Sequence, residues 1–338
     1  MSVLLSFIII WPLILRQSFA DRPFSHYRLA VDRFKLQVRV CLIGTSAMAP
    51  FSNYAADIQA LEIDDDYRAN LAEILSWDIV PTRCMSQGVL RRLALQRGVE
   101  AHLRRMGLWE LLSRLSAART YPVLVAEFIA TYSYDDFYGL VSFRLRGRSF
   151  SLNVIQFNMR LDLIVGGFID PHVARSTRER TWRWLMGGAG LDGDYGIRVE
   201  DLSDPALRYA FLAVSHALFP SKPHHCNVTP IERQLLSMVY PSGHGLPPDM
   251  GYNIVLELWN VAQEANPFRG RKEVSIGSLV TLIATCLGVD LTGLAELPEV
   301  RLIDLDYLCR CGLVTMRVDP PTGEIVVEHC PPRRASQQ

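Results

Sequence analysis

The side chains that could hold a metal ion or act as nucleophiles are scattered through this 338-residue sequence. None of the seven cysteines forms a C-x-x-C pair, and Cys309-x-Cys311 is too tight for a usual zinc half-site. The His-His-Cys run at 224–226 is the one candidate ligand cluster, but adjacent side chains point apart, and a fourth ligand such as His216 or His244 would have to come from elsewhere. We therefore interpret this run as a polar loop, expect reduced thiols, and predict no metal or other cofactor.

The sequence contains near matches to motifs of nucleotide-binding and phosphoryl-transfer proteins, but the segments around them do not have the secondary structure that these motifs need. Residues 188–193 match G-x-G-x-x-G, but that fingerprint needs a preceding strand, and here a tryptophan-rich, helix-like segment comes before it. Residues 133–136, Ser-Tyr-Asp-Asp, come near the Y-x-D-D of reverse transcriptases, but a predicted helix leads into them, so we interpret them as an acidic turn that ends that helix. The sequence holds no P-loop and no Asp-Ser/Thr-Gly of an aspartic protease. We predict that the chain is not an enzyme and takes no small-molecule substrate.

The charged residues suggest a local binding surface and not a basic protein. Lysine plus arginine and aspartate plus glutamate both total 35, and this balance argues against wholesale electrostatic capture of nucleic acid. Between residues 83 and 119, however, eight arginines stand against only Glu100 and Glu110. Arginine makes bidentate contacts with phosphate or carboxylate. We therefore predict RNA or partner contacts for four arginines of this segment: Arg91, Arg92, Arg104 and Arg105.

A second interpretation of these arginines stays open. A run of charges is often a solvated helical face, and acidic residues of the second half of the chain could neutralise this one. The candidates are Glu200, Asp201 and Asp204. In that case we expect no RNA affinity.

The first 20 residues form a hydrophobic leader. Val3–Leu15 is almost wholly apolar and precedes Ser18-Phe19-Ala20, a pattern that resembles the core and cleavage site of a signal peptide. The run is short for a membrane span, and Pro12 interrupts it. We interpret residues 1–20 as a signal-like segment or an artefact of the gene model, and expect no transmembrane span. Because the remainder lacks the marks of a secreted domain, we expect an intracellular protein of the cytoplasm or nucleus.

Helical spacing begins at Ser86, a predicted N-cap. We interpret residues 21–85 as a weakly structured leader and linker with one helix near 67–75. Gly98 and Gly107 are expected to split the following leucine-rich stretch into short helices, and Tyr121-Pro122 to start another. Further helices are predicted over 153–163, 205–219, 231–240, 248–265 and 278–287.

Two stretches change to an alternating pattern. Residues 138–145 and 148–152 flank Arg146-Gly147, and residues 314–318 and 324–328 flank a Pro-Pro-Thr-Gly turn, so both pairs are predicted hairpins. The sequence thus predicts an α+β, mainly helical domain over 86–328 with two small β-hairpins, followed by a disordered tail over 329–338. One packed cluster is expected at the junction of the first hairpin with the next helix: Phe143, Leu145, Phe150, Leu152, Phe157 and Leu161.

The order of these segments carries a resemblance. A leucine-rich stretch with Met106-Gly107-Leu108-Trp109 leads to the hairpin at 141–152, then to Phe157–Leu163, and later to Leu202–Tyr209 and Ser215–Pro220. This order resembles the gag-like protein of the first open reading frame of Athila-type plant retrotransposons, over about residues 86–318. The resemblance implies a structural role with self-association and packaging of element RNA, and it brings no catalytic residues. The chain departs from many gag proteins because it has neither a zinc knuckle nor a strongly basic tail.

The same succession of helix, short hairpin and helix is also similar to the plant mobile domain. That resemblance implies the alternative function, a host nuclear protein that acts in silencing through protein contacts.

Overall fold

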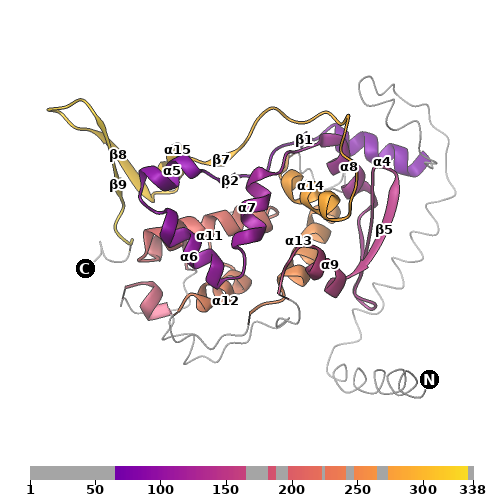
Figure 1. Ribbon diagram of the computed structural model, residues 1–338, viewed down its shortest axis with the longest axis horizontal. Helices are drawn as coiled ribbons and strands as arrows, with labels where there is room; N and C mark the ends of the chain where they lie inside the picture. The colour runs from indigo at the N-terminus through magenta and orange to yellow at the C-terminus, as the bar shows by residue number, and fades with distance from the viewer. Residues whose placement is uncertain are drawn as a thin grey trace, which may run out of the picture. The chain divides into compact units, whose positions relative to one another are not determined.

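Helices hold most of the secondary structure in the residues that the computed structural model describes: 65–164, 182–187, 197–222, 225–240, 247–264 and 273–333. These residues fall in one compact unit (Figure 1). The principal helices are α4 (Asp65–Leu75), α5 (Gln87–Arg92), α6 (Gln96–Arg105), α7 (Trp109–Ala117), α8 (Pro122–Thr131), α9 (Val154–Arg160), α11 (Pro205–Leu218), α12 (Pro230–Met238), α13 (Met250–Glu264), α14 (Gly277–Cys286) and α15 (Leu305–Arg310), with the 3₁₀ turn η1 at Val199–Asp201. In this part of the chain, no helix has the length and apolar character needed to cross a membrane.

The strands form small sheets. β3 (Ser133–Asp135), β4 (Leu140–Leu145) and β5 (Arg148–Asn153) make an antiparallel sheet, and β8 (Val314–Val318) pairs with β9 (Ile325–His329). Two short parallel pairs join distant segments: β1 (Asp78–Ile79) with β6 (Glu273–Val274), and β2 (Cys84–Met85) with β7 (Leu302–Ile303). The predicted α+β, mainly helical fold with two small hairpins is therefore confirmed. The predicted leader at 1–20, the G-x-G-x-x-G run and residues 334–338 of the predicted tail lie outside the described residues. The prediction of a disordered tail from residue 329 is wrong for its first residues, because β9 extends to His329 and the Cys330 N–H donates to the Leu313 carbonyl.

Local capping fixes the helix starts much as predicted. Ser86 accepts the Val89 N–H at the start of α5, and Pro122 is the first residue of α8. Thr229 caps α12 through a capping box with Glu232. These caps satisfy N–H groups that the first turn of a helix leaves free.

The predicted role of Gly98 is wrong. Gly98 lies inside α6, and a Cβ atom built there would come 2.6 Å from Cβ of Ala206 in α11, so glycine allows the close approach of these two helices. The break between α5 and α6 instead occurs at Ala94, whose φ is 54°. Gly107, at φ 71°, separates α6 from α7 as predicted.

The predicted start of the domain at residue 86 is also corrected. Helix α4 confirms the helix expected near 67–75, but its Leu71 side chain is 1% exposed and belongs to the common core. β1 pairs with β6 and β2 with β7, both in the second half of the chain. Residues 65–85 are therefore part of the packed unit, because apolar side chains and strand partners bind them to it. Residues 21–64 of the predicted linker lie outside the described residues.

The first hairpin packs as predicted and gains a third strand. The predicted cluster is confirmed. Four of its side chains are at most 2% exposed: Phe143 and Leu145 on β4, and Phe157 and Leu161 of the α9 segment. The other two, Phe150 and Leu152, are half-buried against them on the outer strand β5. β3 was not predicted: residues 133–135 pair with β4, so they lie in a strand–turn–strand arrangement and not in a turn that ends a helix. The sheet lies beside α8 and α4 (Figure 1).

A buried carboxylate holds the turn of this hairpin. Glu127 of α8 is 4% exposed and accepts the backbone N–H groups of Arg146 and Gly147, both of which have positive φ. Burial raises the pKa of Glu127, and the two N–H donors oppose that rise. The contact fixes the turn, and with it the strand register, to the helix beneath.

Candidate nucleic-acid interface

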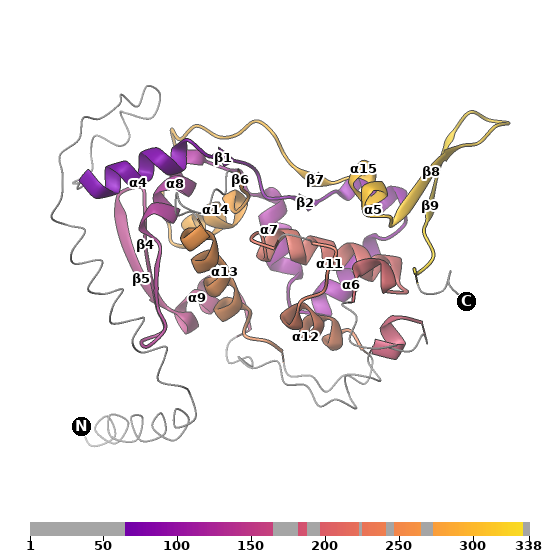
Figure 2. The ribbon, with the colours of Figure 1, turned by 180° about the vertical axis from the view of Figure 1, so that it is seen from behind.

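Helix α6 has one face in the core and one in solvent. Val99 and Leu103 are fully buried on the side that packs on α11, and Figure 2 shows the two helices side by side. His102, on the same side, lies 2.7 Å from the Asp204 carboxylate at the N-cap of α11. This hydrogen bond lowers the pKa of Asp204. The arginines of α6 therefore face away from the core.

Three of the four predicted arginines have no acidic partner among the described residues. Arg91, Arg92 and Arg105 are exposed, and their guanidinium groups bind backbone carbonyls of Gln87, Ile325 and Val239, at 3.4, 3.3 and 3.2 Å. No carboxylate of the described residues forms an ion pair with these three arginines. Their charges are thus open to an external anion.

Arg104 differs from the expectation. Its guanidinium binds Glu100 at 2.9 Å and Glu110 at 3.1 Å, and it also lies over the Trp109 ring at 5.7 Å. The prediction that all four arginines are free of internal carboxylates is wrong here, because both glutamates of the segment converge on this one side chain. Arg104 remains exposed, with 54% of its side chain accessible.

The sequence interpretation missed Arg97. This residue is exposed on α6 and has no ion pair with a described carboxylate. It precedes Arg104 by seven residues, so the two lie on the same side of the helix, about 10.5 Å apart along its axis. That spacing was the available signal. We call the set Arg91, Arg92, Arg97, Arg104 and Arg105 the arginine surface.

Two of the three acidic residues proposed as partners form ion pairs elsewhere. Glu200 pairs with Arg198 and Arg333, each at 3.1 Å, and Asp204 with His102. The alternative in which Glu200 and Asp204 neutralise the arginine surface therefore does not describe this structure.

The candidate ligand run joins a buried network. His225 Nδ1 lies 3.1 Å from Ser215 Oγ, a fully buried hydroxyl that also accepts from Lys222 Nζ at 3.2 Å. Lys222 in turn binds the Glu232 carboxylate at 2.7 Å. A serine beside a histidine can act as a nucleophile, but burial keeps substrates away from this Oγ. The network instead joins α11 to α12.

A neighbouring histidine extends this network to α15. The His216 ring lies 3.9 Å from the His225 ring, centroid to centroid, and its Nε2 hydrogen-bonds the Tyr307 hydroxyl. Burial lowers the pKa of His216 to about 2, so the imidazole is neutral at physiological pH. His224 lies outside the described residues, and those that are described contain no group of three side chains placed to hold a metal ion.

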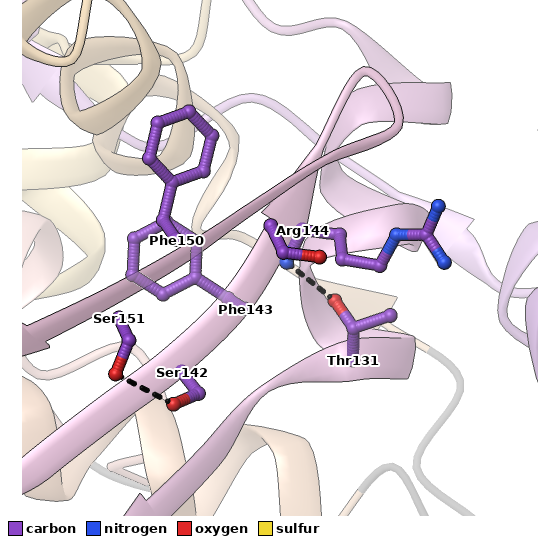
Figure 3. Close-up of a pocket in the computed structure, with 7 residues that line it drawn as sticks. Thr131, Ser142, Phe143, Arg144, Phe150 and Ser151 are labelled. Atoms are coloured by element: carbon purple, nitrogen blue, oxygen red, sulfur yellow. Dashed lines mark hydrogen bonds between the residues drawn. The ribbon is translucent and has the colours of Figure 1, made fainter.

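An open depression of about 340 Å³ lies on the first hairpin (Figure 3). Its polar groups already bind one another: Ser142 Oγ donates to Ser151 Oγ at 3.2 Å, and Thr131 Oγ1 accepts the Arg144 N–H at 2.8 Å. Its lining contains no carboxylate, histidine or cysteine. The hydroxyl groups of the depression therefore have no carboxylate or imidazole in the lining that could activate them as a general base.

A patch of exposed apolar side chains lies where the β3–β4 turn meets α9. The side chains of Phe137 and Tyr138 are 79% and 68% exposed, and the centroids of their rings lie 4.8 Å apart. The Gly139 carbonyl accepts the Val154 N–H, which brings the turn to the start of α9. We call the following set the apolar patch: Phe137, Tyr138, Leu140, Ile155 and Met159.

The sequence matches no protein-family model, and neither a curated protein nor a solved structure matches it. Support for a function therefore comes from the sequence pattern, the arginine surface and the apolar patch.

Proposed function

We propose that the chain is a non-enzymatic, gag-like structural protein of a plant retrotransposon, and that it binds RNA through the arginine surface. The observation that carries this proposal is that Arg91, Arg92, Arg97 and Arg105 are exposed and form no ion pair with a described carboxylate. A planar guanidinium presents paired N–H donors that match a phosphate, and the carbonyl contacts of Arg91, Arg92 and Arg105 leave their positive charges unneutralised.

The neutral chain limits the electrostatics of such a complex. With equal acidic and basic totals, binding depends on this surface and not on overall charge. If the four unpaired arginines each neutralise one phosphate of single-stranded RNA, the logarithm of affinity should fall against the logarithm of salt with a slope of about −3. Arg104, already neutralised by two glutamates, should add little.

The test is a fluorescence-anisotropy titration of the full chain with a single-stranded RNA at several salt concentrations. Arg91→Gln, Arg92→Gln and Arg97→Gln should each reduce the magnitude of the slope by about 0.7. Arg317→Gln is the matched control, because that exposed arginine pairs with Glu328 on a different element. Binding that is absent, or insensitive to salt, would overturn the RNA-binding proposal.

We also propose that a second copy of this chain covers the apolar patch. Opposite charges border the patch, with Asp135 and Asp136 exposed at the β3–β4 turn and Arg160 exposed at the end of α9. In a two-fold contact the same patch meets itself, so Arg160 of each copy can face an aspartate of the other. Aromatic and methionine side chains are enriched in such contacts.

Sedimentation velocity tests this contact. Tyr138→Ala together with Met159→Ala should weaken a concentration-dependent dimer, and Arg160→Glu should weaken it further because like charges then meet. Val318→Ala, an exposed apolar side chain outside the patch, is the control. A monomer at all concentrations would exclude the contact.

The apolar patch also favours a second function, a plant-mobile-domain type of nuclear protein that acts through protein contacts. That function needs the patch but no RNA affinity. Patch-dependent association combined with absent RNA binding would therefore favour it over the gag-like role.

A further inference from the structure

Two aromatic side chains from distant segments meet at the surface. Trp184, in the helical turn at 182–185, is 41% exposed, and Tyr240, just after α12, is half-buried. Their ring centroids lie 5.4 Å apart with the ring planes at 72°, which is an edge-to-face contact. The edge of one ring meets one face of the other, so each ring keeps at least one face that its partner does not cover. We call Trp184 and Tyr240 the aromatic pair.

The backbone on both sides of the aromatic pair is held in place. Next to Trp184, the side chains of Trp182 and Leu185 are at most 2% exposed. The Leu185 carbonyl accepts both the N–H of Ser203 at 2.8 Å and its hydroxyl at 2.9 Å. On the other segment, Val239 is fully buried directly before the tyrosine. Because ordered backbone carries both rings, a ligand that binds them loses little affinity to the ordering of the protein.

The aromatic pair adjoins the arginine surface. Arg105, the last residue of α6, donates from Nη1 to the Val239 carbonyl at 3.2 Å, so its guanidinium lies beside the residue that precedes Tyr240. Figures 1 and 2 both show α12 next to α6. The contact uses a single N–H donor of the guanidinium and leaves its charge unneutralised. Arg183, which precedes Trp184, is also exposed. Positive side chains therefore border the two rings.

This combination of rings and cations indicates the chemistry of a ligand. Proteins bind unpaired nucleobases by stacking the flat base on an aromatic ring while arginine contacts the phosphate. A phosphate alone needs no ring, and the bases of an RNA duplex are stacked on one another and cannot reach one. A purely apolar partner would leave the arginines without an anion. The arrangement therefore fits a single-stranded nucleic acid.

We propose that the aromatic pair is a base-stacking subsite, in which an unpaired base of single-stranded RNA stacks on Trp184 while Arg105 binds an adjacent phosphate. This inference rests on the proposed RNA binding and adds a contact to the bases, which the arginine surface alone does not make. The two kinds of contact differ in their response to salt. A phosphate contact releases counterions and weakens as salt rises, whereas stacking of a neutral base releases none. Loss of the Trp184 ring should therefore lower affinity without changing the salt slope.

Fluorescence-anisotropy titrations of the full chain test the subsite with two labelled probes of equal length and charge. One probe is an oligouridine, whose bases stack weakly on one another, and the other is an oligomer of stable abasic residues with the same phosphates. The wild-type chain should bind the oligouridine at least about five-fold more tightly, because stacking of a base on an aromatic ring contributes on this order. Trp184→Leu should remove most of this preference and keep the wild-type salt slope.

Matched variants separate stacking from phosphate binding and from general effects on the fold. Trp184→Phe keeps a ring and should keep most of the preference for the oligouridine. Trp259→Leu makes the same substitution at a half-buried tryptophan of α13, which packs on α9, and should leave the preference unchanged. Arg105→Gln should instead reduce the magnitude of the salt slope by about 0.7.

The outcomes distinguish this subsite from the RNA-binding function as a whole. Equal affinity of the wild-type chain for the two probes, or a full preference in Trp184→Leu, would overturn the subsite and leave RNA binding by the arginine surface in place. No binding of either probe would overturn both. The comparison of the two probes on the wild-type chain does not depend on whether a variant folds.

Discussion

The two hairpins are alike in sequence pattern and opposite in environment. Both join short antiparallel strands through a turn with a glycine at positive φ, 77° at Gly147 and 69° at Gly323. In the first hairpin, Phe143 and Leu145 are buried beneath α8. In the second, Val318 and Ile325 face each other across the strands at 61% and 56% exposure.

An alternating sequence pattern identifies the apolar face of a strand, but it does not show whether another element covers that face. Met316 and Val318 of β8 lie on the same face as Ile325 and Val327 of β9, just as strand geometry requires. Of β8, only the inner end, at Val314, is buried, and this strand contacts α15. A two-stranded ribbon with an uncovered face adds little stability by itself. The first hairpin should therefore determine the stability of the unit far more than the second.

Truncation of a side chain on each hairpin gives the largest expected contrast. Leu145→Ala should lower the free energy of unfolding by about 2–5 kcal/mol, because it removes buried methyl groups and leaves a cavity. Val318→Ala, on an exposed face, should change it by less than about 0.5 kcal/mol. Urea unfolding followed by circular dichroism measures both. Equal effects would mean that the second hairpin is covered in solution.

A smaller difference is expected between the carboxylates that contact the two hairpins, Glu127 of α8 and Glu328 of β9. Glu127→Gln replaces one carboxylate oxygen by an NH₂ group, so one N–H of the turn loses its acceptor, at a cost of about 1–3 kcal/mol. Glu328→Gln breaks an exposed ion pair with Arg317 and should cost less than about 1 kcal/mol. The same urea titrations compare them. A larger loss from Glu328→Gln would contradict the view that the first turn is held more firmly.

The contribution of Glu127 to stability should also depend on pH. Because burial raises the pKa of Glu127, the unfolded carboxyl ionises near its ordinary pKa of about 4.3, before the folded one does. The proton that the folded state retains stabilises it at low pH, and this contribution is lost as pH rises through the folded pKa. The advantage of wild type over Glu127→Gln should therefore shrink from acid to neutral pH. An advantage that grows with pH would show that the N–H donors outweigh burial.

Local patterns predicted much of the fold. The N-caps at Ser86 and Thr229, and the Arg146-Gly147 turn, depend on contacts within a few residues, so their signal is contained in a short window. Gly98 is a position at which the local sequence pattern gave the wrong prediction. A glycine inside a helical pattern looks like a break, and only the distant Ala206 reveals that it is a site of helix contact.

The candidate site shows the same division. The arginine-rich segment and its exposure followed from composition and period, but the pairing of Arg104 with both Glu100 and Glu110 depends on side-chain geometry. The strand at 133–135 was missed because three residues are too few to show alternation.

The parallel pairs at the start of the domain have a consequence for synthesis. Thr82 donates to the carbonyl of Ser275 across 193 residues, and Arg83 to that of Leu302 across 219. During translation, β1 and β2 leave the ribosome long before β6 and β7 are synthesised. The edges of β1 and β2 therefore stay unpaired while the rest of the domain is translated. Unpaired strand edges recruit other chains. A message cut before the codon of Glu273 would therefore yield a nascent product with permanently open edges, a substrate for chaperones or for aggregation.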